Sequence, residues 1–391
     1  MITYQQFLTK ISNYYQKIGL PEWPPAPVVH GGFPGNFNLS FAEYEFLKYN
    51  NDYFDLKNDM FYTKIQPCIR HNDFIHIQKP SHDSYRYLLR FNMAGMGLYW
   101  KKDLSEREKC TEITINNLLN FLLKECGFEV KNIYVQYLKS APIRQLTEGK
   151  YDFDFYVPDD PNLHYYKKAG VPEGNFLPVQ NRDGFLALNV YGRPTPWGYR
   201  NEIFYKYKGR LLDVGTFESL VFEPIFDENQ QICGLKPYNY MLVVSAIGVE
   251  RVLMVINGLS DVNQLEIISE PAAILRPYID PLSAIQLIQT LRTIQLIVAD
   301  GGIWGKLSKR QRQKIKDFYS LIDKIITANQ IPIEVIARVL QKIAQLEPNL
   351  PQLKNAIGTT IQEYELYKLR KKYSDSYAKH LDELPEYNFT Q

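Results

Sequence analysis

The pattern of hydrophobic residues in this 391-residue chain changes near residue 262. Before that point, runs such as "SYRYLLRFNMAG" and "YMLVVSAIGVERVLMVI" have the alternation or the short apolar length of strands. After it, four segments repeat their apolar residues every three or four positions, as helices do. Segregated strands and helices favour an α+β fold. We expect an antiparallel sheet flanked by helices over residues 1–260, followed by an all-helical domain over residues 261–391.

Helices are also expected within the first part, over residues 1–20 and 105–127, because both segments have helical periodicity and each ends at a glycine. "FYTKIQPCIR" and "SYRYLLRFNMAG" predict two strands joined by a polar loop, and "DENQ" predicts a later hairpin turn. Residues 140–200 are rich in Pro, Gly, Asp and aromatic residues, which indicates a loop-rich, substrate-facing region.

Composition excludes several classes of protein. The formal net charge is only +2, so the chain lacks the strongly basic character of a general nucleic-acid binder. Its four cysteines are scattered without a CxxC pair, which predicts reduced thiols in a cytoplasmic protein. No apolar stretch reaches the length of a membrane span, and the histidine spacing indicates no structural zinc site.

Two adjacent charges, Glu250 and Arg251, interrupt the apolar run that contains Gly248. Burying charges is costly unless they are paired or bind a ligand. A glycine permits close approach of a ligand or backbone, Glu250 can orient the arginine, and Arg251 can bind a polyphosphate. A strand-to-helix junction with an exposed ion pair is the alternative.

Arg70 and three glutamates are the other candidates for chemistry. Arg70 ends a predicted strand, where its guanidinium offers a rigid fork to a phosphate or carboxylate; a surface salt bridge is the alternative. Glu202, Glu218 and Glu223 lie on later strands. Carboxylates on one face of a sheet can hold Mg²⁺ against nucleotide phosphates, although solvent-facing positions are the commoner case.

The order of these parts resembles motifs 2 and 3 of class II aminoacyl-tRNA synthetases, and in detail it is similar to the alanyl-tRNA synthetases. "CIRHNDF" at 68–74 resembles the family's CIRxGGKHNDL, and "AIGVERV" at 246–252 resembles its GMGLERL. Further similarities, in the same order as in the family, are "SHDSYRYLLRFNMAGMGLYW" at 81–100, "NEIFY" at 201–205, "FESLVFEP" at 217–224 and "RTIQLIVADGG" at 292–302.

The resemblance implies that the sheet binds ATP and Mg²⁺ and that a carboxylic acid is activated as its adenylate. Arg70 would bridge the α-phosphate and the carboxylate, Arg251 would hold the γ-phosphate, and Phe91 would stack on adenine. Glu202 and Glu218 are the candidates for Mg²⁺. The remaining nucleotide-binding candidates are Asn72, Asp73, His82 and Gly248.

The chain also departs from the family. Arg70 is followed directly by "HND", whereas the family has GGK before these residues. Val244 stands where the family has an Asp that pairs with the amino group of alanine, and an apolar side chain cannot pair with an ammonium. Phe185 and Leu186 stand near the family's Trp, so these two residues and Val244 predict a different substrate pocket. The sequence ends at 391, so we expect neither the editing domain nor the C-terminal module of the family.

These departures favour an AMP-forming, ATP-dependent ligase outside translation, acting on a carboxylic acid and passing the acyl group to an amine or another small acceptor. The acid can be one without a free α-amino group. A minimal enzyme that aminoacylates tRNA is the alternative, and a catalytically inert relative is a third. A homodimer is expected from class II relatives.

A cluster of basic residues lies near the start of the second predicted helix of the helical domain. This cluster could contact tRNA, although a solvated helix face is as consistent with the near-zero net charge. Its members are Lys306, Lys309, Arg310, Arg312, Lys314 and Lys316.

Overall fold

The computed structural model describes residues 1–372 except 32, 34, 43, 46–47, 49–53, 55–57, 101–105, 188 and 191–192. The chain forms two compact units. Unit 1 comprises Met1–Ala26, Leu39–Cys68 and Phe91–Val262, and unit 2 comprises Pro27–Asn38, Ile69–Arg90 and Asn263–Gln391. One division falls near the predicted change at 260/261. The sequence pattern did not predict that two earlier segments, Pro27–Asn38 and Ile69–Arg90, pack with the helical unit.

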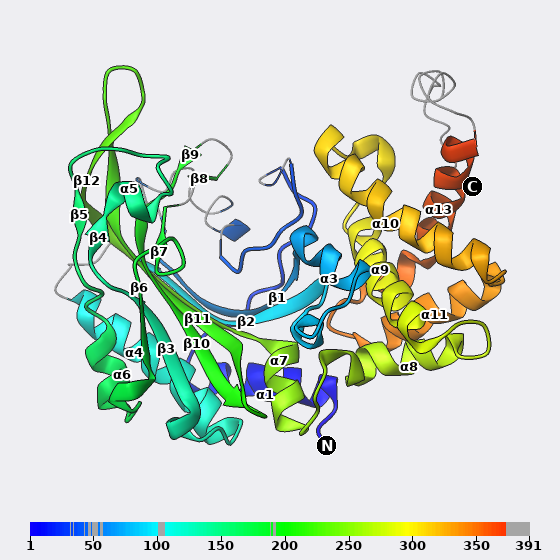
Figure 1. The fold of residues 1–391 in the computed structure, drawn as a ribbon, viewed down its shortest axis with the longest axis horizontal. Coiled ribbons are helices and arrows are strands. Elements are labelled where there is room, and N and C mark those ends of the chain that lie inside the picture. The colour runs from blue at the N-terminus through cyan, green and yellow to red at the C-terminus, as the bar shows by residue number, and fades with distance from the viewer. Residues whose placement is uncertain are drawn as a thin grey trace. The chain divides into compact units, whose positions relative to one another are not determined.

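Unit 1 is built on an eight-stranded sheet of described residues, with the order β1-β2-β12-β11-β10-β3-β6 and β7 beside β10 (Figure 1). The pairs from β2 through β12, β11 and β10 to β3 are antiparallel, and β3 and β6 are parallel. The predicted sheet is therefore confirmed, with a parallel pair at one edge. Its strands are β1 (Met60–Ile69), β2 (Arg90–Trp100), β3 (Ile133–Leu138), β6 (Phe176–Val179), β7 (Phe185–Leu186), β10 (Trp197–Tyr207), β11 (Arg210–Phe226) and β12 (Ile232–Gly248).

The long hairpin of β11 and β12 turns where the sequence predicts it. The Asp227 carboxylate accepts hydrogen bonds from the backbone N–H groups of Asn229 (2.9 Å) and Gln231 (2.8 Å), which closes the turn. Close strand packing explains two glycines of the sheet. A Cβ atom at Gly95 or Gly198 would overlap the backbone of the neighbouring strand, so no larger residue fits there without a shift.

The helices of unit 1 form where amphipathic segments cover the sheet. Helix α1 (Tyr4–Lys17) begins with a capping box between Thr3 and Gln6 and buries its apolar side. Helix α4 (Arg107–Asn120) continues into a π-helical turn, η4 (Phe121–Glu125), and stops at Gly127, whose φ is +73°. The remaining elements are η5 (Val130–Asn132), β4 (Ala141–Pro142), α5 (Ile143–Leu146), β5 (Tyr156–Val157), α6 (Leu163–Lys168), η6 (Glu173–Asn175), β8 (Asn189–Val190), β9 (Arg193–Pro194) and α7 (Val249–Ile256).

Unit 2 is helical, and each of the four helical patterns in the sequence forms a helix: α9 (Pro281–Ala299), α10 (Lys309–Ala328), α11 (Ile333–Leu346) and α13 (Ile357–Lys372) (Figure 1). Helix α9 starts at Asp280, whose carboxylate accepts from two backbone N–H groups, followed by Pro281. The other elements are η1 (His71–Asp73), α3 (Phe74–Gln78), η2 (Ser84–Arg86), η7 (Val262–Gln264), α8 (Glu266–Leu275), η8 (Trp304–Lys306) and α12 (Gln352–Asn355).

Helix α9 is the one helix in the described part of the chain that is long and apolar enough to cross a membrane. Within the fold, 72% of its apolar window is buried. Length and composition are satisfied equally by the core helix of a helical unit, and α9 is such a helix, because every residue from Leu287 to Val298 is buried.

Candidate functional site

Three candidate residues of unit 1, Glu202, Glu218 and Val244, come together on one face of the sheet. In the register, Val244 of β12 lies opposite Glu218 of β11, and Glu218 lies opposite Arg200 of β10. In the next row, Glu202 lies opposite Thr216. Cross-strand partners project to the same side of a sheet, so these five side chains share one surface. We call it the glutamate face.

A half-buried ion pair forms the centre of the glutamate face. The Arg200 guanidinium donates from Nη2 to Oε1 of Glu202. Burial, with the negative charge of Asp213 nearby, raises the pKa of Glu202 to about 7, and Arg200 opposes this rise. Burial also raises the pKa of Glu218, again opposed by Arg200. Burial therefore favours the protonated form of both carboxylates, and the positive charge of Arg200 opposes this effect on each of them.

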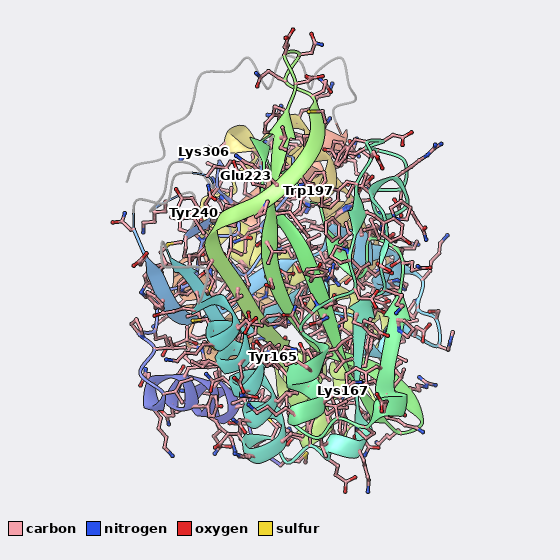
Figure 2. All side chains as sticks on the ribbon, turned by 90° about the vertical axis from the view of Figure 1, so that its left-hand side faces the viewer. Tyr165, Lys167, Trp197, Glu223, Tyr240 and Lys306 are labelled. Atoms are coloured by element: carbon pink, nitrogen blue, oxygen red, sulfur yellow. The ribbon has the colours of Figure 1, made fainter. Side chains whose placement is uncertain are left out.

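Arg200 was not predicted as a site residue. It directly precedes "NEIFY", and two-residue spacing places it on the same side of the strand as Glu202. Glu223, the third predicted carboxylate, lies farther along β11 (Figure 2) and forms an ion pair with Lys236 of β12 at 3.0 Å. The Glu223 side chain is 16% exposed, so it forms a partly buried cross-strand pair and does not occupy the solvent-facing position that the sequence offered as the alternative.

The two adjacent charges at the start of α7 have separate partners. Glu250, only 2% exposed, accepts hydrogen bonds from the Asn92 backbone N–H (2.9 and 3.1 Å), the Asn92 side-chain amide (3.0 Å) and the Tyr4 hydroxyl (3.1 Å). These bonds satisfy the buried carboxylate and anchor α7 to β2 and α1. The expectation that Glu250 orients Arg251 is therefore wrong, because the carboxylate is already occupied by Asn92 and Tyr4.

Asp213 orients Arg251 instead. Arg251 Nη1 donates to the Asp213 carboxylate at 2.7 Å and to the Asp213 backbone carbonyl at 3.2 Å. Asp213 lies opposite Phe204 of β10, beside a bulge, and its charge acts on Glu202. Arg251 and Asp213 therefore extend the charged series of the glutamate face toward the start of α7.

Polar atoms on this face fit a phosphate-bearing ligand. Arg200 Nε and Thr216 Oγ1 are buried, with no hydrogen-bond partner in the described structure. Buried polar groups are normally satisfied, so such orphaned atoms indicate a missing ligand or water. The arginine nitrogen is a donor and the threonine hydroxyl can donate or accept, which suits phosphate oxygens.

The face also fits Mg²⁺ when that ion is brought with phosphates. Over the described residues, no group of three or more His, Cys, Asp or Glu side chains is placed to hold a metal. Glu202 and Glu218 supply two carboxylates. Mg²⁺ is commonly bound by one or two carboxylates together with substrate phosphates, so this pair suits a nucleotide-bound ion better than a protein-only site.

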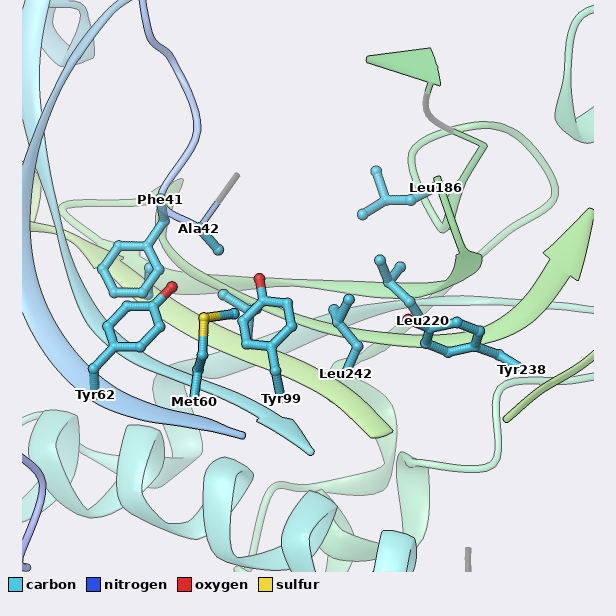
Figure 3. Close-up of a cluster of buried hydrophobic side chains, with 11 residues drawn as sticks. Phe41, Ala42, Met60, Tyr62, Tyr99, Leu186, Leu220, Tyr238 and Leu242 are labelled. Atoms are coloured by element: carbon cyan, nitrogen blue, oxygen red, sulfur yellow. The ribbon is translucent and has the colours of Figure 1, made fainter. Parts of the chain in front are cut away.

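The predicted substrate pocket is divided between two apolar clusters. Val244 and Leu186 belong to the cluster drawn in Figure 3, with Leu220 and Leu242. Phe185 packs in a second cluster, which includes Trp197. Successive residues of a strand point to opposite faces, so the prediction that Phe185 and Leu186 line one pocket is wrong. Leu186 and Val244 remain together beside the glutamate face.

Two further candidates lie on β2 and at the start of α7. Phe91 is half-buried, two residues from Met93, and therefore on the same side of β2. Gly248 lies opposite Met93 in the register. A Cβ atom at Gly248 would meet only the Arg251 side chain, at 3.8 Å or more, so protein packing does not require a glycine here. Adenine stacking on Phe91 and nucleotide binding at Gly248 stay predictions.

The other candidates lie in unit 2. Arg70 is 42% exposed, its Nη1 is 3.9 Å from the Asp73 carboxylate, and its backbone N–H donates to the Leu89 carbonyl at 3.1 Å. Asn72 lies in the 3₁₀ turn that follows Arg70, and it lines a surface hollow together with Phe74 and Asp317. His82 is 79% exposed. Because Arg70 and Arg251 belong to different units, their convergence on one triphosphate stays a prediction.

Comparison with known proteins agrees with the motifs. No family model matches the chain. The alanine–tRNA ligase of Jannaschia sp. (strain CCS1) is 22% identical over 268 residues, which are 64% of this chain and 26% of that protein. The chain thus spans about a quarter of the length of this curated relative.

Solved structures were also found to be similar. A pyrrolysyl-tRNA synthetase of Desulfitobacterium hafniense is 12% identical, with 67% of this chain and 71% of that chain covered and a TM-score of 0.34. An aspartyl-tRNA synthetase of Entamoeba histolytica is 10% identical, with 68% and 57% covered and a TM-score of 0.34.

Proposed function

Because this chain contains an alanyl-tRNA synthetase-like class II core, we propose that it is an ATP-dependent ligase that adenylates a carboxylic acid. The observation that carries the proposal is the series of charges on one face of the sheet, in which Arg200 lies between Glu202 and Glu218 and Arg251 lies on Asp213. Phosphoryl and nucleotidyl transfer depend mainly on positioning and charge neutralisation, which fixed guanidinium groups and carboxylates supply.

The proposed reaction has two steps. A carboxylate oxygen of the acid attacks the α-phosphorus of ATP, and the bond from that phosphorus to the oxygen bridging to the β-phosphate breaks, so that pyrophosphate leaves. An amine then attacks the acyl carbon, the acyl–oxygen bond to AMP breaks, and the nitrogen releases a proton. Arg251 would hold the γ-phosphate and Arg70 the α-phosphate with the carboxylate. Mg²⁺, held by Glu202 and Glu218, would supply positive charge to the phosphates.

The nature of the acid depends on Val244 and its neighbour. Val244 is 4% exposed and apolar, so this position offers an ammonium no partner. An acid without a free α-amino group is therefore the preferred substrate. Glu218, the cross-strand neighbour of Val244, is the carboxylate through which an amino acid would still be recognised.

Aminoacylation of tRNA is the second candidate function. It is favoured by exposed basic side chains around the start of α10. Not all of the predicted cluster is available, because Lys314 Nζ donates to the Gly35 carbonyl (3.0 Å) and to the Asn36 side chain (2.8 Å). The exposed members are Lys306, Lys309, Arg310 and Lys316.

We also propose a cytoplasmic location. The four cysteines, Cys68, Cys110, Cys126 and Cys233, are all free thiols, as expected in a reducing compartment. The membrane-length helix α9 is mostly buried within the fold, and the expectation of no membrane partner stays a prediction. A homodimer stays a prediction.

ATP–pyrophosphate exchange tests the proposed function. The acids should be offered as matched pairs, each amino acid beside the same acid without its α-amino group. We expect Mg²⁺-dependent exchange with at least one acid, and stronger exchange with the member that lacks the amino group. Exchange with no acid would overturn the proposal, and exchange confined to amino acids would overturn the preference that Val244 suggests.

Binding of total tRNA separates the two candidate functions. The ligase with a small acceptor predicts weak binding that is insensitive to replacement of Lys309 and Lys316 by Ala. Salt-sensitive binding that these two substitutions weaken would favour the tRNA enzyme, because each lost phosphate contact reduces the salt dependence by about one counterion.

A further inference from the structure

Helix α9 is largely buried, and three of its long polar side chains lie on successive turns. Gln286, Gln289 and Arg292 are spaced three residues apart, which places them near one another along one side of the helix. A buried polar side chain is costly unless it is hydrogen-bonded. Each of these three residues forms a hydrogen bond with the segment Ile69–Arg90, which contains Arg70.

Gln289 lies closest to Arg70 in this network. Its side chain is 1% exposed, and its Oε1 accepts a hydrogen bond from the Leu89 N–H at 2.9 Å. Its Nε2 donates to the Asn263 side chain at 2.6 Å and to the Tyr87 carbonyl at 3.4 Å. The carbonyl of Leu89 accepts the backbone N–H of Arg70 at 3.1 Å. Gln289 therefore holds Leu89 in place, and Leu89 in turn holds the backbone of Arg70.

The neighbouring polar residues hold the rest of the segment. Gln286 Nε2 donates to the carbonyls of Ile77 (2.8 Å) and Gln78 (3.2 Å), at the end of α3. Figure 1 shows α3 beside α9. Arg292 Nη1 donates to the carbonyl of Arg90 at 3.5 Å. One side of α9 thus contacts the segment at its middle and at its far end.

A buried charge cluster secures the far end. Glu347 forms an ion pair with Arg90 through Oε2 and with Arg292 through Oε1. The Nε of Arg292 is 2.9 Å from Glu347 Oε1. Each of the three side chains is at most 1% exposed. Removing one partner would leave buried charge without compensation, so this end of the segment is held firmly to α9.

We propose that Gln289 is a positioning residue for carboxylate activation, because it holds Leu89 and through it the backbone of Arg70. The inference rests on the proposed function, in which Arg70 contacts the α-phosphate and the acid. It gives the helical unit a part in the first chemical step, beyond any part in recognising an acyl acceptor.

Gln289→Met is the test variant, because methionine has a similar volume and lacks both hydrogen-bonding groups. Gln295→Met is the matched control. Gln295 is on the same helix and fully buried, but its Nε2 donates to the carbonyls of Leu340 (3.1 Å) and Leu353 (3.0 Å), outside the Arg70 segment. Both variants lose a buried amide, and only one loses the link to Leu89.

Amide hydrogen exchange of the full chain is the first readout. We expect the Arg70 and Leu89 amides to exchange at least about tenfold faster in Gln289→Met than in Gln295→Met, because loss of a buried hydrogen bond changes a local opening equilibrium by about that factor. Equal protection of these amides in the two variants would overturn the proposal.

ATP–pyrophosphate exchange is the second readout. Gln289→Met should lower kcat about tenfold with little change in the KM for ATP, whereas Gln295→Met should keep kcat. In an Arg70→Lys background Gln289→Met should add little further loss, because its effect runs through Arg70. Unchanged kcat in Gln289→Met, or fully additive losses, would overturn this inference alone. A wild type inactive with every acid would overturn the proposed function instead.

Discussion

Two clusters of arginine and glutamate in this protein have similar compositions and different surroundings. In unit 2, Arg90, Glu347 and Arg292 are at most 1% exposed and hold a chain segment to α9. In unit 1, Arg200 is 32% exposed and Glu202 12% exposed. The first cluster is buried by the surrounding protein, whereas the charged groups of the second are partly exposed on one face of the sheet. Exposure, more than residue type, distinguishes this structural charge cluster from the charges of the candidate site.

The same contrast holds between adjacent residues. Glu250 receives four hydrogen bonds from Asn92 and Tyr4 and is closed within the fold. Arg251, the next residue, is 18% exposed and lies on Asp213 at the glutamate face. At the start of α7, a carboxylate that stabilises the fold is therefore followed directly by a guanidinium that we assign to the nucleotide.

The largest effect on stability is expected for the closed cluster. Glu347→Gln should lower the free energy of unfolding by about 3–5 kcal/mol, because two buried arginines lose their compensating charge. Chemical denaturation measures this loss. Glu218→Gln on the open face is the comparison and should change stability by less than about 1 kcal/mol. Similar losses in both variants would remove the distinction between the clusters.

An intermediate effect is expected in the pH dependence of stability. The pKa of Glu202 is raised to about 7 in the folded protein, so the folded state keeps a proton that the unfolded chain releases. The bound proton therefore contributes to the free energy of unfolding. This contribution is fully present below the ordinary glutamate pKa, and it is lost as the pH rises through about 7. Denaturation at pH 5 and pH 8 should show a smaller decline in Glu202→Gln than in wild type. Equal declines would contradict the assignment of a raised pKa.

The smallest effect is expected for Glu223→Gln. Glu223 pairs with Lys236, which is 50% exposed, and exposed ion pairs contribute about 0–1 kcal/mol. Stability and ATP–pyrophosphate exchange should both stay close to wild type. A clear loss of exchange in Glu223→Gln would show that Glu223 belongs with the glutamate face after all.

Much of the fold followed from local sequence patterns. The helices of unit 2 repeat their apolar residues strictly, and the turn at Asp227 has its own side-chain hydrogen bonds, so both form as predicted. Phe185 was misplaced because the two neighbours of a short strand point to opposite faces, and the sequence does not say which one faces the site.

Long-range pairing explains what the sequence did not reveal. Arg200 gains its importance from Glu218, a neighbour only through the register of β10 and β11. Glu250 accepts hydrogen bonds from Asn92 and Tyr4, which lie 158 and 246 positions away in the sequence. The grouping of Ile69–Arg90 with α9 likewise involves distant contacts, such as that of Gln289 with Leu89, which lies 200 positions away.

The effect of Arg251→Ala on ATP–pyrophosphate exchange tests most directly whether the glutamate face binds the nucleotide. Arg144→Ala is the control, because Arg144 is 71% exposed and forms a surface ion pair with Asp152 at 3.3 Å. We predict that exchange falls at least about a hundredfold in Arg251→Ala, as expected for loss of a charge-assisted phosphate contact, and is unchanged in Arg144→Ala. Wild-type exchange in a folded Arg251→Ala protein would contradict the assignment.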